Sequence, residues 1–137
     1  MPMAKLADGP RPFTLLGEDI VLWLQADGTP AAVRDRCCHR TAKLSRGFVT
    51  EAGHLACGYH GWQYDCSGAC VKIPQQPDTQ IPAGAKVRTW KVVERYGCIF
   101  TWHDPEGGEP DVDLPDIKAW EDPQFVHWKL DRLGTIN

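Results

Sequence analysis

Two short clusters of cysteine and histidine constrain this chain more than any other feature of its sequence. The first, residues 37–39, reads Cys-Cys-His, and the second, residues 57–60, reads Cys-Gly-Tyr-His. Thiolate sulfur and imidazole nitrogen are donors to transition metals, and each cluster brings one of each kind within a few residues. The pattern predicts two tight loops around one metal centre, with the candidate ligands Cys37, His39, Cys57 and His60.

Further residues surround the candidate ligands. From residue 37 to residue 62 the pattern is Cys-x-His-Arg … Leu-Ser-x-Gly … Cys-x-Tyr-His-Gly-Trp. It resembles the cluster-binding signature of Rieske [2Fe–2S] domains. The match is to the kind found in aromatic-ring-hydroxylating and demethylating oxygenases, such as vanillate demethylase and phenoxybenzoate dioxygenase. The resemblance covers roughly residues 13–104.

The resemblance implies a [2Fe–2S] cluster as cofactor, with two ligands on each iron. Cys37 and Cys57 would hold the inner iron, and His39 and His60 the outer, more exposed one. Two neutral imidazoles in place of two thiolates raise the reduction potential to roughly −150 to +300 mV, from about −400 mV in plant-type clusters. The second nitrogen of each ring stays free to hydrogen-bond to a partner.

The sequence departs from the family pattern beside both cysteines. Many relatives have proline after each ligand cysteine, whereas Cys38 and Gly58 stand there in this chain. Cys38 adjoins Cys37, but the spacing to the histidine favours Cys37 as the ligand. The cytochrome-complex branch of the family carries a cysteine and a serine hydroxyl where this chain has Tyr59 and Trp62. The missing cysteine and hydroxyl donor indicate the low-potential oxygenase branch.

Other interpretations of the same residues stay open. Two thiolates and two imidazoles also form tetrahedral zinc sites, which would make the chain a zinc-stabilised binding module. Zinc requires none of the surrounding motif residues, and one-residue Cys-x-His spacing is less usual for it, so we favour iron and sulfide. A free-standing Rieske ferredoxin is the alternative within redox chemistry.

Short apolar runs separated by turn residues predict an all-β fold. The 137 residues include eleven prolines and thirteen glycines, which suit many turns and no long helix. The Rieske resemblance implies the same class, as short antiparallel sheets with a small cluster-binding subdomain of two loops. The expected strands are residues 13–16, 20–24, 31–34, 47–49, 54–57, 62–65, 69–73, 87–94 and 98–102.

The chain changes character after residue 104. Between Asp104 and Asp122 there are eight acidic residues and one lysine. We interpret residues 1–12 as a flexible lead-in, 13–104 as the Rieske domain, and 105–137 as an acidic connector and apolar tail leading toward an absent catalytic domain. Apolar residues on such a tail pack either against the β-core or against a second domain or subunit. They are Trp120, Phe125, Val126, Trp128, Leu130, Leu133 and Ile136.

Catalytic subunits of Rieske oxygenases hold a mononuclear iron with two histidines and a carboxylate in a second domain. His103 and His127 are too far apart in this sequence to match that pattern. We therefore expect no catalytic residue here. The resemblance implies a flavin or ferredoxin reductase as electron donor and an oxygenase catalytic domain as acceptor.

Charge and hydropathy narrow the remaining function classes. The formal net charge is −3, and no basic tract suggests nucleic-acid binding. The longest fully apolar run, residues 20–24, is far shorter than the roughly 20 residues of a membrane span. Residues 1–8 hold no apolar signal core, so we expect a cytoplasmic protein without membrane contact. In that compartment the cysteines outside the metal motif are expected as free thiols: Cys38, Cys66, Cys70 and Cys98.

Basic residues gather around the first cysteine and histidine cluster, with Asp35 as the one acid among them. They form either a docking face for an acidic electron donor or ordinary solvated surface. These residues are Arg34, Arg36, Arg40, Lys43 and Arg46.

Overall fold

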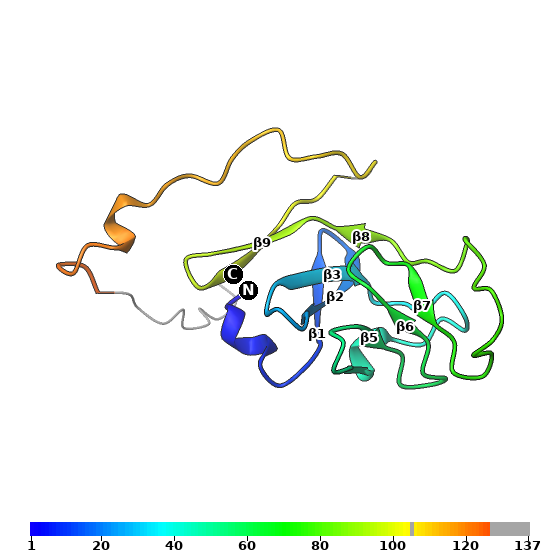
Figure 1. Ribbon diagram of the computed structural model, residues 1–137. Helices are drawn as coiled ribbons and strands as arrows, with labels where there is room; N and C mark the ends of the chain where they lie inside the picture. The colour runs from blue at the N-terminus through cyan, green and yellow to red at the C-terminus, as the bar shows by residue number, and fades with distance from the viewer. Residues whose placement is uncertain (105, 127–137) are drawn as a thin grey trace, which may run out of the picture.

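The computed structural model describes residues 1–104 and 106–126, which form short strands joined by turns (Figure 1). Every helix in these ranges is a 3₁₀ turn of three or four residues, so the predicted all-β class is confirmed. In chain order the elements are η1 (Met3–Leu6), β1 (Arg11–Leu15), β2 (Glu18–Leu24), β3 (Pro30–Arg34), η2 (Leu44–Arg46), β4 (Phe48–Val49), β5 (Leu55–Ala56), β6 (Gln63–Tyr64), β7 (Cys70–Lys72), β8 (Thr89–Trp90), β9 (Val92–Arg95), β10 (Cys98–Thr101) and η3 (Lys118–Trp120).

Strand β2 is the centre of the first sheet, whose order is β1-β2-β3-β8 with antiparallel neighbours. Successive side chains of a strand point to opposite faces. Ile20 and Leu22 therefore pack on one face with Trp90, whereas Val21 and Trp23 pack on the other. Both faces of β2 are covered, which explains why its sequence is a continuous apolar run rather than an alternating one.

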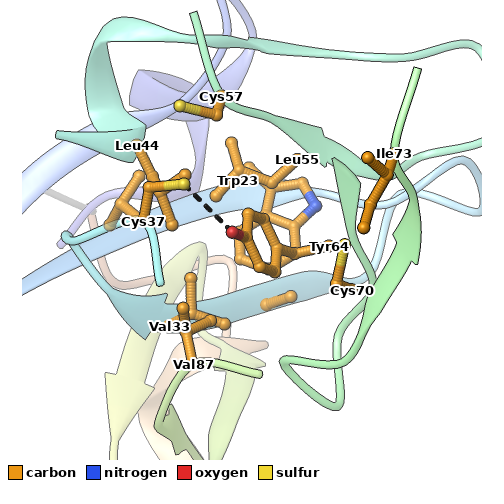
Figure 2. Close-up of a cluster of buried hydrophobic side chains, with 12 residues drawn as sticks. Trp23, Val33, Cys37, Leu44, Leu55, Cys57, Tyr64, Cys70, Ile73 and Val87 are labelled. Atoms are coloured by element: carbon orange, nitrogen blue, oxygen red, sulfur yellow. Dashed lines mark hydrogen bonds between the residues drawn. The ribbon is translucent and has the colours of Figure 1, made fainter. Parts of the chain in front are cut away.

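A second antiparallel sheet, β4-β5-β6-β7, shares a core with the first. Trp23 and Val33 from the first sheet meet Leu55 and Tyr64 from the second (Figure 2). The two cysteine and histidine loops follow β3 and β5, one from each sheet. The shared core therefore lies directly beneath both loops and fixes their relative position.

The strand expected over residues 87–94 is wrong as a single element. The chain forms β8 and β9 instead, with a break at Lys91. β8 pairs with β3, whereas β9 pairs with β10 in a separate two-stranded sheet. The expected strand is divided because the chain leaves the first sheet at this point. Which sheet a strand joins depends on the whole fold, so the local sequence does not predict the break.

The described part of the connector returns to the tip of the β9–β10 hairpin (Figure 1). Arg95 donates a hydrogen bond to the Leu114 carbonyl at 3.0 Å, and the Tyr96 hydroxyl donates to the Pro115 carbonyl at 3.0 Å. The Ile117 amide in turn donates to the Tyr96 oxygen at 2.8 Å. These polar contacts hold the connector against the β9–β10 hairpin. Several apolar side chains of the connector stay exposed: Val112, Ile117, Trp120, Phe125 and Val126.

The N-terminal residues are tied to the same hairpin. Met1 and Ile99 exchange two backbone hydrogen bonds, of 3.0 and 2.7 Å, and Leu6 is buried. Within residues 1–104 and 106–126 no helix is long and apolar enough to cross a membrane. His127 and the tail residues Trp128, Leu130, Leu133 and Ile136 lie outside the described residues.

Candidate metal centre

The two loops have the same backbone hydrogen bonds. The Cys37 amide donates to the Ala42 carbonyl at 2.8 Å, and the Cys57 amide donates to the Trp62 carbonyl at 2.8 Å. Each cysteine carbonyl also accepts a bond of 2.9 Å from the amide four residues later. Both loops thus wrap around the backbone of their cysteine in the same way, which places the two thiols in equivalent positions.

The four candidate ligands form an inner pair and an outer pair. Cys37 and Cys57 are both 2% exposed, and Figure 2 shows them beside the shared core. His39 is exposed and His60 is half-buried, with ring centroids 4.8 Å apart. The structure therefore places Cys37 beside Cys57 and His39 beside His60, with sulfur inside and imidazole outside.

The ring of His39 is held in place by Trp62. The two rings are parallel within 5°, and their centroids lie 4.5 Å apart. Trp62 thus covers one face of a candidate ligand. Such stacking limits rotation of the imidazole and keeps its nitrogen aimed at one place.

The chemistry of the site suits a metal cluster. Burial raises the pKa of the Cys57 thiol, while the amides of Tyr59 and His60, which hydrogen-bond to its sulfur, act in the opposite direction. These amides stabilise a thiolate once a metal replaces its proton. Desolvation first, then the nearby charges of His60 and Arg40, lower the pKa of His39. A lowered pKa favours neutral imidazole, which is the form that binds metals.

Sequence reasoning missed the role of Tyr64. Its side chain is fully buried, and its hydroxyl oxygen lies 3.0 Å from the sulfur of Cys37 and 3.3 Å from that of Cys38. The dashed line in Figure 2 marks the shorter contact. Burial and these two contacts raise the pKa of the phenol, which keeps it neutral and able to donate. Strand β6 therefore supplies a hydroxyl beside the first loop, at a position other than that of Trp62.

The Leu-Ser-x-Gly part of the motif braces the first loop. Asp35 is 4% exposed and accepts hydrogen bonds from the Ser45 amide and hydroxyl, both at 2.7 Å. A Cβ added at Gly47 would overlap the Ala56 carbonyl oxygen, so no other residue fits there. Ser45 therefore satisfies a buried carboxylate, and Gly47 permits the close approach of the two loops.

A third segment covers the second loop. Gln75 donates a hydrogen bond to the His60 carbonyl at 2.7 Å. Pro74 lies so near Gly61 that an added Cβ there would be 3.1 Å from the proline ring. The proline-rich stretch after β7 therefore packs against the backbone of the second loop.

Among residues 1–104 and 106–126 no three Cys, His, Asp or Glu side chains lie close enough together to hold a single metal ion. The candidate ligands instead form two pairs, Cys37 with Cys57 and His39 with His60. Each pair has one residue from each loop. A [2Fe–2S] cluster of the mixed type takes two ligands per iron, one pair of sulfurs and one pair of nitrogens. The paired arrangement suits such a cluster.

A sequence profile described as the Rieske [2Fe-2S] domain matches residues 1–93. The chain belongs to the Rieske [2Fe–2S] domain family. Rieske domains bind a [2Fe–2S] cluster, so the zinc interpretation is set aside. A second profile, the 3-ketosteroid 9alpha-hydroxylase C-terminal domain, matches residues 101–137.

Several relatives of this Rieske domain are named as components of oxygenase systems. It is 44% identical over 122 residues to a putative toluene-4-sulfonate monooxygenase system iron-sulfur subunit, TsaM2 of Comamonas testosteroni, a match that covers 85% of this chain and 34% of the relative. It is 42% identical over 117 residues to the methylxanthine N1-demethylase NdmA of Pseudomonas putida, covering 85% and 32% of the two chains. The chain therefore spans about a third of the length of these relatives.

Solved structures agree with the sequence comparison. The Rieske domain superposes on NdmA from Pseudomonas putida with a TM-score of 0.80 at 39% identity, over 90% of this chain and 38% of that one. It superposes on dicamba monooxygenase with a TM-score of 0.77 at 38% identity, over 90% and 37% of the chains. The fold is that of the Rieske domain of these oxygenases.

Proposed function

We propose that this chain passes electrons through its Rieske cluster to the mononuclear iron centre of an oxygenase domain that acts on an aromatic compound. The observation that carries this proposal is the layering of the site, with buried Cys37 and Cys57 beneath the surface rings of His39 and His60. Apolar surroundings exclude water from the inner side. The outer side is open to close approach by a partner.

In this proposal Cys37 and Cys57 hold the inner iron, and His39 and His60 hold the outer iron. When bound, the cluster accepts and releases one electron. The amides of Tyr59 and His60 and the hydroxyl of Tyr64 place hydrogen-bond donors on the two cysteine sulfurs. Each imidazole keeps a second ring nitrogen for a hydrogen bond to an acceptor group on a partner.

The electron donor is proposed to be a flavin or ferredoxin reductase that docks beside the first loop. An open hollow of about 350 Å³ lies between the two loops, lined by Ala42, Lys43, Arg46, Gly58 and Tyr59. Lys43 and Arg46 are both exposed, and Asp35 is buried and hydrogen-bonded to Ser45. The basic residues around the hollow suit an acidic donor surface.

The electron acceptor is proposed to be a catalytic domain that continues from the connector. The match of residues 101–137 to the C-terminal domain of 3-ketosteroid 9alpha-hydroxylase supports this, as do the exposed apolar side chains of the connector. We retain 1–12 as a lead-in, 13–104 as the Rieske domain and 105–137 as the connector and tail. The 3-ketosteroid-9-alpha-monooxygenase of Rhodococcus rhodochrous, 29% identical, is named as an oxygenase component, so systems of this kind have several components.

The cytoplasm remains the proposed location. Bacterial relatives such as TsaM2 support it, whereas the TIC 55 protein and pheophorbide a oxygenase of plants are chloroplast proteins. Fractionation of the native host, followed by detection of this chain with an antibody, tests the location directly.

Turnover with separated components tests the electron-transfer proposal. The cluster-loaded chain is mixed with reductase, NAD(P)H and candidate aromatic substrates, with and without a separately expressed catalytic domain. We expect the reductase to reduce the chain in both cases and product to form only when the catalytic domain is present. Substrate oxidation by this chain without that domain, at a rate proportional to its iron content, would contradict the proposal.

A free-standing Rieske ferredoxin is distinguished in the same assay. Such a ferredoxin would also be reduced without product, but it would exchange electrons with unrelated oxygenases as fast as with a catalytic domain joined to this connector. We expect a clear preference for the joined domain, since the connector holds donor and acceptor close together.

A further inference from the structure

The hydroxyl of Tyr64 lies between two sulfur atoms. It is 3.0 Å from the sulfur of Cys37 and 3.3 Å from the sulfur of Cys38. Cys38 is exposed as a residue, yet its sulfur turns inward far enough to reach this buried oxygen. A phenol carries one proton and has an oxygen that also accepts, so Tyr64 donates to one sulfur only.

The direction of the two hydrogen bonds follows from the roles of the sulfurs. An iron-bound cysteine is a thiolate, which has no proton and accepts. With Cys37 as a ligand, Tyr64 must therefore donate to Cys37. In this assignment Cys38 is not a ligand, and its thiol donates to the Tyr64 oxygen. The result is a series of two hydrogen bonds, in which Cys38 donates to Tyr64 and Tyr64 donates to Cys37.

Such a chain has an electrostatic consequence for the cluster. Each hydrogen bond in a series polarises the next, so donation by Cys38 strengthens donation by Tyr64. A stronger donor on a ligand sulfur stabilises the reduced cluster, which carries one more negative charge, relative to the oxidised cluster. The reduction potential therefore rises.

We propose that Cys38 is a positioning residue that raises the reduction potential of the cluster through Tyr64 without binding iron. The proposal rests on the proposed role of Cys37 as a ligand. Many relatives carry proline after the cysteine that corresponds to Cys37. Proline has no side-chain donor and cannot donate a hydrogen bond to the Tyr64 oxygen. The extra donor is therefore a feature of this chain rather than a requirement for holding a cluster.

Redox titration of the cluster-loaded chain tests the proposal. The variants are Cys38→Ala, Cys38→Ser, Tyr64→Phe and the double variant Cys38→Ala/Tyr64→Phe. Each is equilibrated with redox dyes, and its visible and electron paramagnetic resonance spectra are recorded. We expect Cys38→Ala to lower the equilibrium constant for reduction about two- to fivefold, and Tyr64→Phe to lower it further. Cys38→Ser restores part of the loss, because its hydroxyl also donates.

The double variant separates the proposed route from a general effect of the substitution. If Cys38 acts through Tyr64, removing Cys38 from the Tyr64→Phe chain changes nothing more. Cys66→Ala is the matched control, since Cys66 is an exposed cysteine in the β6–β7 turn, and it should keep the potential of the parent chain. An Fe–S stretching frequency that shifts in Cys38→Ala but not in Cys66→Ala gives an independent readout.

Three results would overturn the proposal. They are an unchanged potential in Cys38→Ala, an equal effect of Cys38→Ala with and without Tyr64, and the loss of the cluster spectrum in Cys38→Ser. The last result, together with a retained spectrum in Cys37→Ser, would instead make Cys38 the ligand and refute the ligand assignment. Failure of the proposed function, by contrast, shows in the turnover assay and leaves these potentials unaffected.

Discussion

Thr41 and Gly61 occupy the same place in the two metal loops. Each is the fourth residue after its cysteine, and each donates its amide to that cysteine's carbonyl at 2.9 Å. Their φ angles are 56° and 70°, so both residues adopt the left-handed conformation. Glycine tolerates this conformation, whereas a β-branched residue is strained in it. The first loop therefore carries strain that the second loop avoids.

Replacing Thr41 with glycine is expected to stabilise the protein. The left-handed conformation costs a residue with a Cβ roughly 1–2 kcal/mol, and extra freedom of glycine in the unfolded chain costs about 0.4–1 kcal/mol. The net gain in the free energy of unfolding is therefore between zero and about 1.6 kcal/mol. Denaturant unfolding of the cluster-loaded chain measures it. Thr41→Ala keeps the Cβ and serves as the control, and an equal gain in that variant would refute the strain argument.

The candidate ligands and the fold class follow from sequence because their signals are local. Cys37 and His39 are two residues apart, so one tight loop must present both. The strain at Thr41 gives no such signal, since a β-branched residue argues against the conformation that the loop imposes on it. The contact between Tyr64 and Cys37 could not be predicted from the sequence for another reason. The Tyr64 hydroxyl reaches Cys37 only because β6 pairs with β5 and turns this residue inward, and pairing between strands is set by the whole fold.

Substitution of the ligands tests the assignment of the cluster. Cys37→Ser, Cys57→Ser, His39→Ala and His60→Ala are each expected to lose or destabilise the cluster, since each leaves an iron with one ligand fewer. The parent chain should be red-brown with about two irons and two sulfides per chain, which metal analysis and visible absorption measure.

The other cysteines provide the controls for that series. Cys66, Cys70 and Cys98 are free cysteines outside the proposed ligand set, and their replacement by serine should leave the spectrum intact. A variant Cys66→Ser that bleached the protein, beside a Cys57→Ser that did not, would show the assignment to be wrong.

Removing the hydroxyl of Ser45 is expected to weaken the first loop. Ser45→Ala leaves the buried Asp35 carboxylate with one hydrogen bond fewer, because the bond of 2.7 Å from the hydroxyl disappears. The loss of a bond to a buried charged group costs about 1–3 kcal/mol of unfolding free energy. Denaturant unfolding and the rate of cluster loss at fixed temperature measure the effect.

Ser67 is the matched control for Ser45. Its hydroxyl donates to Asp65 at 2.6 Å, but it is exposed in the β6–β7 turn. Water replaces an exposed hydrogen bond, so Ser67→Ala is expected to change the free energy of unfolding by less than about 0.5 kcal/mol. Equal losses of unfolding free energy in both serine variants would mean that burial of Asp35 does not strengthen its hydrogen bond to Ser45.

The pH dependence of the cluster-free chain reports on His39. Its pKa is lowered from 6.5 by desolvation, then by the charges of His60 and Arg40, so the folded state binds fewer protons than the unfolded state near that pH. Stability therefore increases with pH through this window and is lost as the pH falls below about 6.5. Denaturant unfolding between pH 5 and pH 8 should give a slope of this sign. His39→Gln should flatten the curve, whereas His54→Gln, on a half-buried histidine just before β5, should retain it. A steeper loss of stability at low pH in His39→Gln than in the parent chain would contradict the assignment.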